Sequence, residues 1–211
     1  MSVCIGIISY FPKDLILRWK RVERCRELFF SIERIFPDIP IFLIAQNWDN
    51  EIVLSDKITA YYYDKLGVLG ARKALRNKFL LSKFDYMIML DDDCILSGTK
   101  QDGDDLLEQL YNEEGRYLIT RDNMLKMCTI SRQVYGKYPL VELSPEAGTG
   151  LEDLAYCRLL RMMCPEKEMK YFGKLQEVSN WTKDASISTW DRRDIISLVK
   201  KTVDYMNSLQ N

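Results

Sequence analysis

The sequence predicts a single α/β domain in which helices flank a central, mostly parallel sheet. Short apolar runs rich in β-branched and aromatic residues recur along its first half. A segment with apolar residues at helical spacing separates the first two of these runs, an arrangement typical of parallel sheets. The 211 residues are enough for one domain, and a hydrophobic content of 47% supplies a core.

The first part of the chain alternates strand, helix and strand. The apolar run at 3–10 predicts a central strand, and apolar residues spaced for one helix face follow between 22 and 36. Two further runs, at 41–45 and 58–63, predict the second and third strands. The arginines of the helix lie off its apolar face, so we expect them to be solvated: Arg21, Arg24, Arg26 and Arg34.

Two glycines, Gly67 and Gly70, precede the next expected helix. Glycine lets the backbone approach a ligand closely, and the start of a helix favours anions. Arg72, expected in the first turn, is therefore a candidate for contact with a diphosphate. The alternative is a tight loop followed by a solvated basic helix face, and the residues alone leave both open.

The most informative stretch is a buried strand that runs into acids. Five apolar residues at 86–90 precede Asp91, Asp92 and Asp93. Adjacent carboxylates repel one another and resist desolvation, so this ending needs a reason. A hard cation such as Mg²⁺ or Mn²⁺ supplies one, because it binds carboxylates together with substrate phosphates. Ligands also bind at the carboxyl ends of such strands. A solvated turn is the alternative.

The second half is less regular. We expect a polar turn at 97–105, a short helix at 106–111, and strands at 117–120 and 124–130, the latter a candidate for an antiparallel strand. A loop region is expected at 135–150, and 172–190 has no clear pattern. Helices are expected from Thr149, which has capping-box spacing with Glu152, and from Asp191. We therefore divide the domain into a nucleotide-binding half (1–98), an acceptor-side half (99–190) and a C-terminal helix (191–211).

Composition excludes several kinds of site. The chain contains no histidine, which excludes a Ser-His-Asp triad, an HExxH zinc site and a histidine base. A net charge of −1 gives no reason to expect nucleic acid as a partner. Six cysteines without CxxC spacing predict reduced thiols in a cytoplasmic compartment. No apolar run is long enough to span a membrane.

The order of these motifs resembles the GT-A fold of nucleotide-sugar glycosyltransferases, most closely its family-two-like pattern, over residues 3–162. The matching segments are the end of the first strand, the Gly-x-x-Gly-Ala-Arg segment, a DxD motif and a later Glu-Asp helix motif. In this chain they read as Ile8-Ser9-Tyr10, Gly67 to Arg72, Asp91-Asp92-Asp93, and Gly150-Leu151-Glu152-Asp153 with Arg158.

The resemblance implies transfer of a hexose from a UDP-sugar to a hydroxyl acceptor, such as a glycan of a glycoprotein, with Mn²⁺ or Mg²⁺. It places Asp91 at the ribose or sugar and assigns Asp93, with Asp91, to the metal. Arg72 would contact the donor phosphates or sugar, and Asp153 would be the acceptor-side base. The remaining donor-binding residues would be Ser9, Tyr10, Asp49 and Asp92.

Two features depart from the family pattern. The loop after the second strand reads Asn47-Trp48-Asp49 in place of an acidic-rich pattern, which affects base specificity. Many GT-A enzymes use a late histidine on the metal; here Asp, Asn or water must take that place.

The length and the lack of an anchor also resemble the small GT-A domains at the front of multidomain glycosyltransferases of large algal DNA viruses. That resemblance implies a cytoplasmic enzyme acting on a capsid glycoprotein, with further domains following residue 211.

Three other functions compete with this interpretation. A haloacid-dehalogenase-like phosphatase would use Asp91 as its nucleophile, although Cys94-Ile95 replaces the usual Gly-Thr. A sugar-1-phosphate nucleotidyltransferase would need a glycine-rich loop where Tyr10-Phe11-Pro12 stands. A non-catalytic module that binds a glycan or a nucleotide sugar would keep the fold without the reaction.

Overall fold

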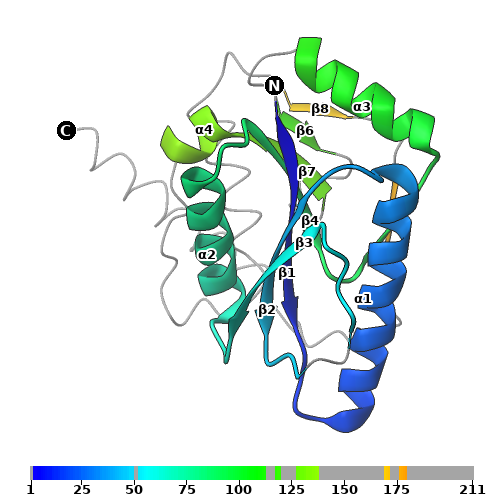
Figure 1. Cartoon of the computed structure of the whole chain (residues 1–211), viewed down its shortest axis with the longest axis vertical. Helices are drawn as coiled ribbons and strands as arrows, with labels where there is room; N and C mark the ends of the chain where they lie inside the picture. Colours follow the sequence, from blue (N-terminus) through cyan, green and yellow to red (C-terminus); the bar gives the residue numbers. More distant parts are fainter. Residues whose placement is uncertain are drawn as a thin grey trace, which may run out of the picture.

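A computed structural model describes residues 2–49, 52–112, 117–119, 127–137, 169–171 and 176–179. Within these ranges the molecule is built on a seven-stranded mixed sheet of order β3-β2-β1-β4-β7-β6-β8. Helices cover both of its faces (Figure 1). The predicted α/β class, with a central sheet flanked by helices, is confirmed.

Four strands form the parallel part of the sheet: β1 (Val3–Tyr10), β2 (Ile41–Gln46), β3 (Ile58–Tyr63) and β4 (Tyr86–Asp91). In their register Tyr10 lies beside Gln46, Gln46 beside Tyr63, and Ile8 beside Asp91. The carboxyl ends of the four strands therefore lie along one edge of the sheet, which we call the carboxyl edge.

The other strands extend the sheet beyond β4. β7 (Met127–Ser131) pairs antiparallel with β4, and β6 (Tyr117–Ile119) pairs antiparallel with β7. β8 (Met169–Tyr171) runs parallel to β6. The expected antiparallel strand near 124–130 is thus confirmed over Met127–Ser131.

A second, two-stranded sheet follows the acidic turn. It pairs β5 (Cys94–Ser97) antiparallel with β9 (Gln176–Ser179). β9 lies within 172–190, where no element was predicted, because a four-residue strand is too short to show a period.

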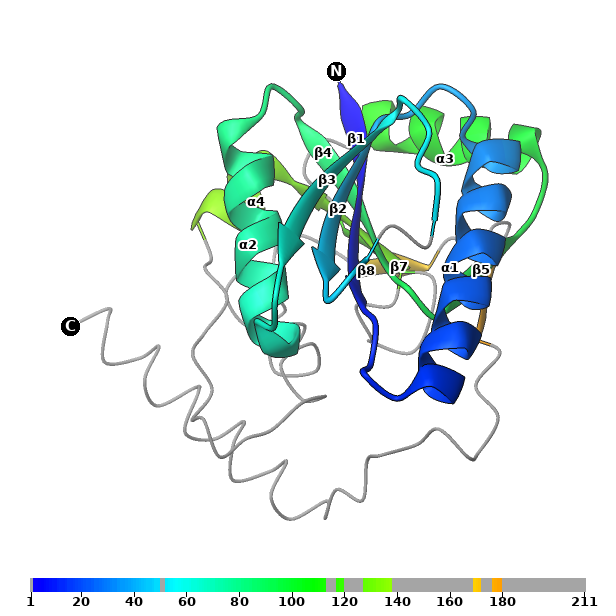
Figure 2. The same ribbon diagram turned by 60° about the horizontal axis from the view of Figure 1, so that its bottom comes forward.

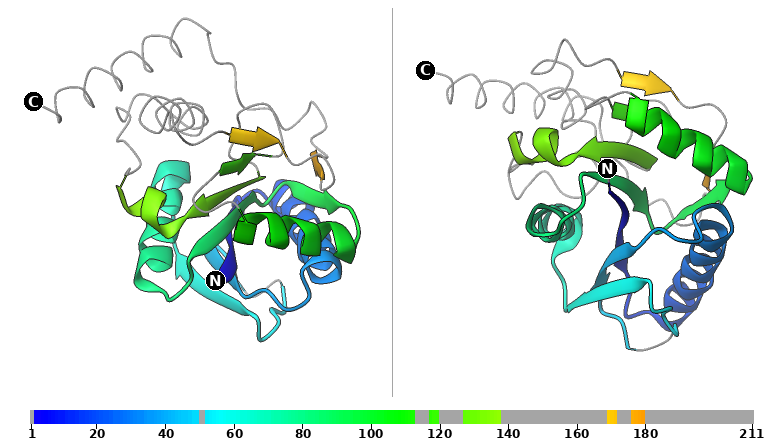
Figure 3. Two further views of the ribbon diagram at one scale, coloured as in Figure 1. Left: turned by 90° about the horizontal axis from the view of Figure 1, so that it is seen from above. Right: turned by 45° about the horizontal axis from the view of Figure 1, so that its top comes forward.

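The helices form one layer on each face of the large sheet. α1 (Leu15–Ile35) and α3 (Lys100–Asn112) pack on one face, and α2 (Gly67–Leu81) and α4 (Arg132–Lys137) on the other (Figures 1 and 3). α1 begins after the N-cap Asp14, whose carboxylate accepts a hydrogen bond from the Leu17 backbone N–H at 2.9 Å.

Side chains of the central strands alternate between these two layers. In β4, Ile88 and Leu90 join the core beneath α1, whereas Met87 and Met89 join the core beneath α2. The same alternation, continued past Met89 and Leu90, assigns Asp91 to the α2 side and Asp92 to the α1 side. Asp91 and Asp92 therefore face different helices.

The connection from β2 to β3 contains no helix in its described residues. Trp48 and Ile52 of this segment are buried and complete the core beside α1. Asn47 begins it in the left-handed region, with φ of 56°, and its backbone N–H donates to the Tyr63 carbonyl at 2.9 Å. The loop thus fills space that a crossover helix usually occupies.

Three predicted boundaries were wrong. α2 begins at Gly67, so Gly70 lies inside the helix and Arg72 in its second turn, not its first. α3 begins at Lys100, inside the expected polar turn, because Thr99 caps it: Thr99 and Asp102 exchange hydrogen bonds there. α4 extends to Lys137, past the expected start of the loop.

Other predictions concern residues only partly described. Cys4, Cys25, Cys94 and Cys128 are buried free thiols, as expected, while Cys157 and Cys164 lie outside the described residues. The helices expected near 149 and 191 also lie outside them, and the division at 98 stays a prediction. Among the described helices, none combines the length and the apolar character needed to cross a bilayer.

Candidate functional site at the carboxyl edge

The carboxyl edge gathers most of the predicted site residues. Ser9 and Tyr10 end β1, Asp49 follows β2, Asp91 ends β4, and Asp92 and Asp93 form the turn before β5. Figure 2 turns this edge toward the viewer. Asp153 lies outside the described residues, so its place relative to the others stays a prediction.

Asp92 is the buried centre of this arrangement. One carboxylate oxygen accepts a hydrogen bond from the Ser9 hydroxyl at 2.7 Å and from the Tyr10 backbone N–H at 3.3 Å. The other oxygen accepts from Arg21 Nη1 of α1 at 2.7 Å. Asp92 and Ser9 are 8% and 2% exposed, so these contacts link the ends of β1, β4 and α1 beneath the surface.

Opposing influences act on the charge of Asp92, and burial prevails, so its pKa lies above the ordinary value. Burial raises the pKa of Asp92, the Arg21 guanidinium opposes that rise, and the neighbouring Asp93 charge adds to it. Cys25 lies below, with its Sγ 3.9 Å from the Ser9 hydroxyl. Burial and then the Asp92 charge raise the pKa of the Cys25 thiol, so it stays protonated and unreactive.

Asp91 has a different arginine on the opposite face of the sheet. Arg72 Nη2 of α2 lies 3.0 Å from an Asp91 oxygen, and Arg72 is only 4% exposed. Arg72 continues the buried stripe of α2 through Leu75 and Phe79. The alternative of a solvated basic face is therefore wrong for Arg72.

The described residues offer a hard divalent cation two carboxylates, Asp91 and Asp93, and no complete set of ligands. The described residues contain no group of three acidic or sulfur side chains able to hold a metal. Asp91 and Asp93 are half-buried at the edge, whereas Asp92 is turned inward. Mg²⁺ and Mn²⁺ commonly bind one or two carboxylates plus phosphate oxygens and water, so two carboxylates at the surface are an adequate protein contribution.

At the other end of the edge lies an open cavity of about 570 Å³. Asp49 lines it with its side chain 82% exposed, and one of its oxygens lies 2.7 Å from Arg18 Nη2. The same nitrogen donates to the Asn47 carbonyl at 2.7 Å, so α1 also fixes this loop. Arg18 also lines the cavity, and the other lining residues are Lys13, Asn47, Trp48, Tyr62, Tyr63 and Asp64.

Stacked aromatic rings support this cavity from below. The rings of Phe11 and Trp48 are 4.4 Å apart and nearly parallel, and Arg18 lies 5.7 Å from the Phe11 ring centre. Tyr10 is half-buried nearby, with the Lys65 ammonium 6.0 Å from its ring centre. The loop carrying Asp49 is therefore held by packing as well as by charge.

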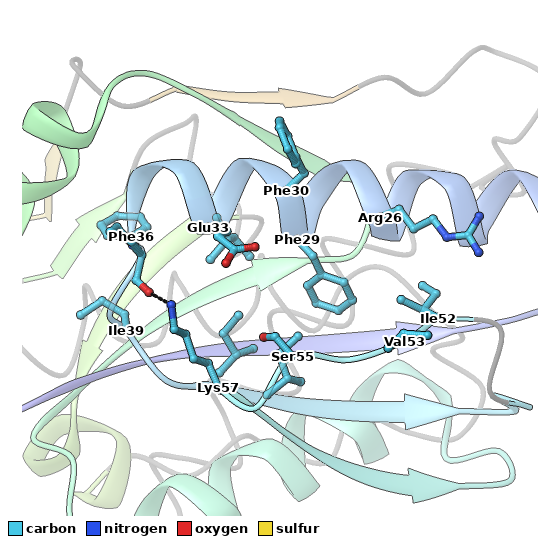
Figure 4. Close-up of a pocket in the computed structure, with 14 residues that line it drawn as sticks. Arg26, Phe29, Phe30, Glu33, Phe36, Ile39, Ile52, Val53, Ser55 and Lys57 are labelled. Carbon is cyan, nitrogen blue, oxygen red and sulfur yellow. Dashed lines mark hydrogen bonds between the residues drawn. The ribbon is translucent and has the colours of Figure 1, made fainter.

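A second cleft lies away from these residues. It measures about 210 Å³ and reaches the amino ends of β2 and β3, between α1 and the 52–58 segment. Phe29 points toward that segment, Phe30 points away, and Lys57 donates to the Pro37 carbonyl (Figure 4). Of the predicted site residues that the structure describes, none lines this cleft.

Sequence reasoning missed two residues of the site, Arg18 and Arg21. The expectation that the arginines of α1 are solvated is wrong for Arg21, which contacts Asp92. The sequence did contain a signal. Cys25, Leu28 and Ile32 are buried on one face of α1. Arg21 and Arg18 stand four and seven residues before Cys25, which places them on the same face. Both arginines lie on the sheet-facing stripe, where it passes the carboxyl edge.

Solved structures share this architecture. Glucosyl-3-phosphoglycerate synthase from Mycobacterium tuberculosis, in complex with Mn²⁺, UDP and phosphoglyceric acid, aligns at a TM-score of 0.57 and 8% identity, covering 98% of this chain and 78% of that one. The chain has the GT-A fold.

Two further structures agree. A putative nucleotide-diphospho-sugar transferase from Desulfovibrio desulfuricans G20 aligns at a TM-score of 0.50 and 10% identity, covering 96% of this chain and 99% of that one. S. aureus TarS 1–349 in complex with UDP aligns at 0.55 and 8% identity, covering 74% of this chain. The match spans 54%, about half, of that TarS structure. No protein-family model and no curated protein matches the chain.

Proposed function

We propose that this protein is a metal-dependent glycosyltransferase that moves a hexose from a UDP-sugar to a hydroxyl acceptor. The observation that carries the proposal is the layout of the carboxyl edge. An open cavity beside Asp49 lies at one end and the half-exposed carboxylates Asp91 and Asp93 at the other. A nucleotide diphosphate is a ligand with a matching polarity: a base at one end and an anionic, metal-binding group at the other.

Each part of the edge has a role in this proposal. Asp49 accepts a hydrogen bond from the base in the cavity, and Tyr10 contacts the nucleoside from the end of β1. Asp91 faces the ribose or sugar, and Asp93 with Asp91 holds the cation. Ser9 and Asp92 support the site from inside the protein, because their polar atoms bind one another and are buried.

The chemistry is the departure of UDP from the sugar. A bound Mn²⁺ or Mg²⁺ would neutralise the negative charge that grows on the leaving diphosphate. Arg72 orients Asp91 through their ion pair and adds positive charge at the same end of the site. We assign to Asp153, on the resemblance alone, the removal of the acceptor proton. A glycoprotein glycan as acceptor and a cytoplasmic, viral setting also rest on the resemblance alone.

Calorimetry with UDP, with and without Mn²⁺, tests the donor site, and a panel of UDP-sugars assayed for hydrolysis tests the reaction. We expect Mn²⁺ to strengthen UDP binding in the parent protein. Asp93→Ala should remove that gain and slow donor turnover by on the order of 100-fold. Asp104→Ala is the matched control, since Asp104 is an exposed acid on α3.

The competing functions give different results. The metal role is contradicted if UDP binds equally well with and without Mn²⁺. It is also contradicted if the Asp93→Ala protein hydrolyses UDP-sugars at the parental rate. A non-catalytic module shows no donor turnover at all. A phosphatase would form a trappable phospho-aspartate at Asp91 from a phosphomonoester, which a glycosyltransferase does not.

A further inference from the structure

Two of the three acids at the end of β4, Asp91 and Asp92, pair with arginines of different helices. Asp91 lies 3.0 Å from Arg72 of α2, and Asp92 lies 2.7 Å from Arg21 of α1. The alternation of β4 places them on opposite faces, and each helix supplies one arginine on its sheet-facing stripe. Like charges that would repel one another are thus drawn apart.

The contacts of Asp92 leave it well satisfied within the protein. It accepts from Arg21, from the Ser9 hydroxyl and from the Tyr10 backbone N–H. A carboxylate in this position without a counter-charge would resist burial and turn toward water, which here means toward the carboxyl edge. Its two neighbours in the chain would then move with it, because all three belong to one short turn.

We propose that Arg21 is a positioning residue of the donor site. By binding Asp92 on the α1 side of the sheet, it holds the turn between β4 and β5 so that Asp91 and Asp93 face the donor diphosphate. The proposal rests on the proposed function, and it adds α1 to the elements that shape the metal end of the site.

Arg21 could act on the donor site indirectly, through Asp92, or directly, by contact with the diphosphate, and the two roles have different consequences. Arg21 has its Nη1 committed to Asp92, and its side chain is 26% exposed. If Arg21 acts only through the charge of Asp92, removing that charge makes Arg21 dispensable. If Arg21 instead contacts the diphosphate itself, the charge of Asp92 is irrelevant to its loss.

Four variants test this: Arg21→Met, Arg21→Lys, Asp92→Asn and the double variant Arg21→Met/Asp92→Asn. UDP affinity is measured by calorimetry with and without Mn²⁺, well below the melting temperature of each variant. We expect Arg21→Met to weaken the Mn²⁺-dependent affinity by roughly 10- to 100-fold, as loss of an outer-shell partner typically does. Affinity without Mn²⁺, which depends on the cavity at Asp49, should not change.

The double variant is decisive. A neutral amide in place of the Asp92 carboxylate needs no counter-charge and still accepts from the Ser9 hydroxyl, so most of the lost Mn²⁺-dependent affinity should return. Arg21→Lys keeps the charge without the planar fork and should fall between parent and Arg21→Met. If Arg21→Met does not fold, the comparison of Arg21→Lys with Arg21→Lys/Asp92→Asn replaces it.

A matched control is Arg34→Met. Arg34 is another arginine of α1, and its Nη2 donates to the Leu96 carbonyl of β5 at 3.0 Å, away from Asp92. Its loss removes a contact of the same helix with the segment after the turn, and Mn²⁺-dependent UDP affinity should stay at the parental value.

The outcomes distinguish this proposal from the function on which it depends. A parent protein without Mn²⁺-dependent UDP binding overturns both. A parent that binds, with Arg21→Met equal to it, overturns the positioning role alone. A double variant as weak as Arg21→Met also overturns it and makes Arg21 a direct ligand.

Discussion

The two ends of the carboxyl edge use the same side chain in opposite ways. At the β4 end, Asp92 is 8% exposed and receives three hydrogen bonds that tie two strands and a helix together. At the β2 end, the side chain of Asp49 is 82% exposed and forms an ion pair with Arg18 beside an open cavity. In both cases the arginine comes from α1.

The difference shows that an aspartate at a strand end is not in itself a ligand. Burial and the number of donors decide whether its oxygens are committed to the protein. Asp92 has little exposed surface left for a substrate, whereas Asp49 keeps most of its surface. We therefore expect substitution of Asp92 to affect mainly folding and substitution of Asp49 to affect mainly binding.

The largest effect is expected for Asp92→Ala. It leaves Arg21, the Ser9 hydroxyl and the Tyr10 N–H without their acceptor, and breaking a buried pair in this way typically costs about 3–5 kcal/mol of unfolding free energy. Asp49→Ala removes an exposed ion pair and should cost less than about 1 kcal/mol. Urea unfolding of both variants measures the two values.

UDP affinity supplies the other half of that comparison. Asp49→Ala should weaken binding by about tenfold, the loss of one charge-assisted hydrogen bond, while unfolding like the parent. Equal losses of stability in the two variants would show that exposure does not separate the two ends.

Arg72→Met is expected to have an intermediate effect. Arg72 is buried like Asp92, but its partner Asp91 lies at the edge, so both stability and turnover should fall. We expect roughly 2 kcal/mol lost in urea unfolding and about 100-fold slower donor hydrolysis. The control Arg76→Met removes an arginine one turn later that binds the Tyr135 carbonyl, and turnover should stay parental. Arg72→Met with parental turnover would restrict Arg72 to folding.

The smallest effect concerns Cys25 and alkaline pH. Burial, followed by the Asp92 charge, raises the pKa of the thiol above its ordinary value of 9.0. The folded state therefore keeps a proton that the unfolded state loses, and stability falls as pH rises past 9, by at most about 1.4 kcal/mol per pH unit. Cys25→Ala should lessen this slope.

Unfolding midpoints of parent and Cys25→Ala between pH 8 and pH 10 measure the slope. Identical slopes would show that Cys25 does not titrate on unfolding, and rapid alkylation of Cys25 in the folded protein would show that it is not buried.

Much of this fold follows from local pattern. The runs at 3–10, 41–45 and 58–63 became β1, β2 and β3 within one residue, because buried parallel strands are continuous apolar segments. β8 and β9 were missed, since three or four residues carry no period and their partners are distant in sequence. The start of α3 was missed because its first three residues, Lys100 to Asp102, are polar and carry no apolar period.

The site was predictable as a set of residues but not as a set of roles. The acids were found from the sequence, but Asp91 and Asp92 bind different arginines, and which arginine each binds depends on which helix covers each face of the sheet. Arg21 could have been found by extending the apolar stripe of α1 toward its N-terminus. Whether such an arginine meets a carboxylate depends on the sheet order, which a local pattern does not contain.

The connection between β2 and β3, whose described residues contain no helix, has a consequence for protein engineering. Trp48 and Ile52 seal the interior while Asp49, between them in the chain, lines the cavity. Transplanting this loop from another protein of the same fold would replace two interior side chains at the same time. Grafts that keep both of these residues and vary only the positions around Asp49 should retain the scaffold.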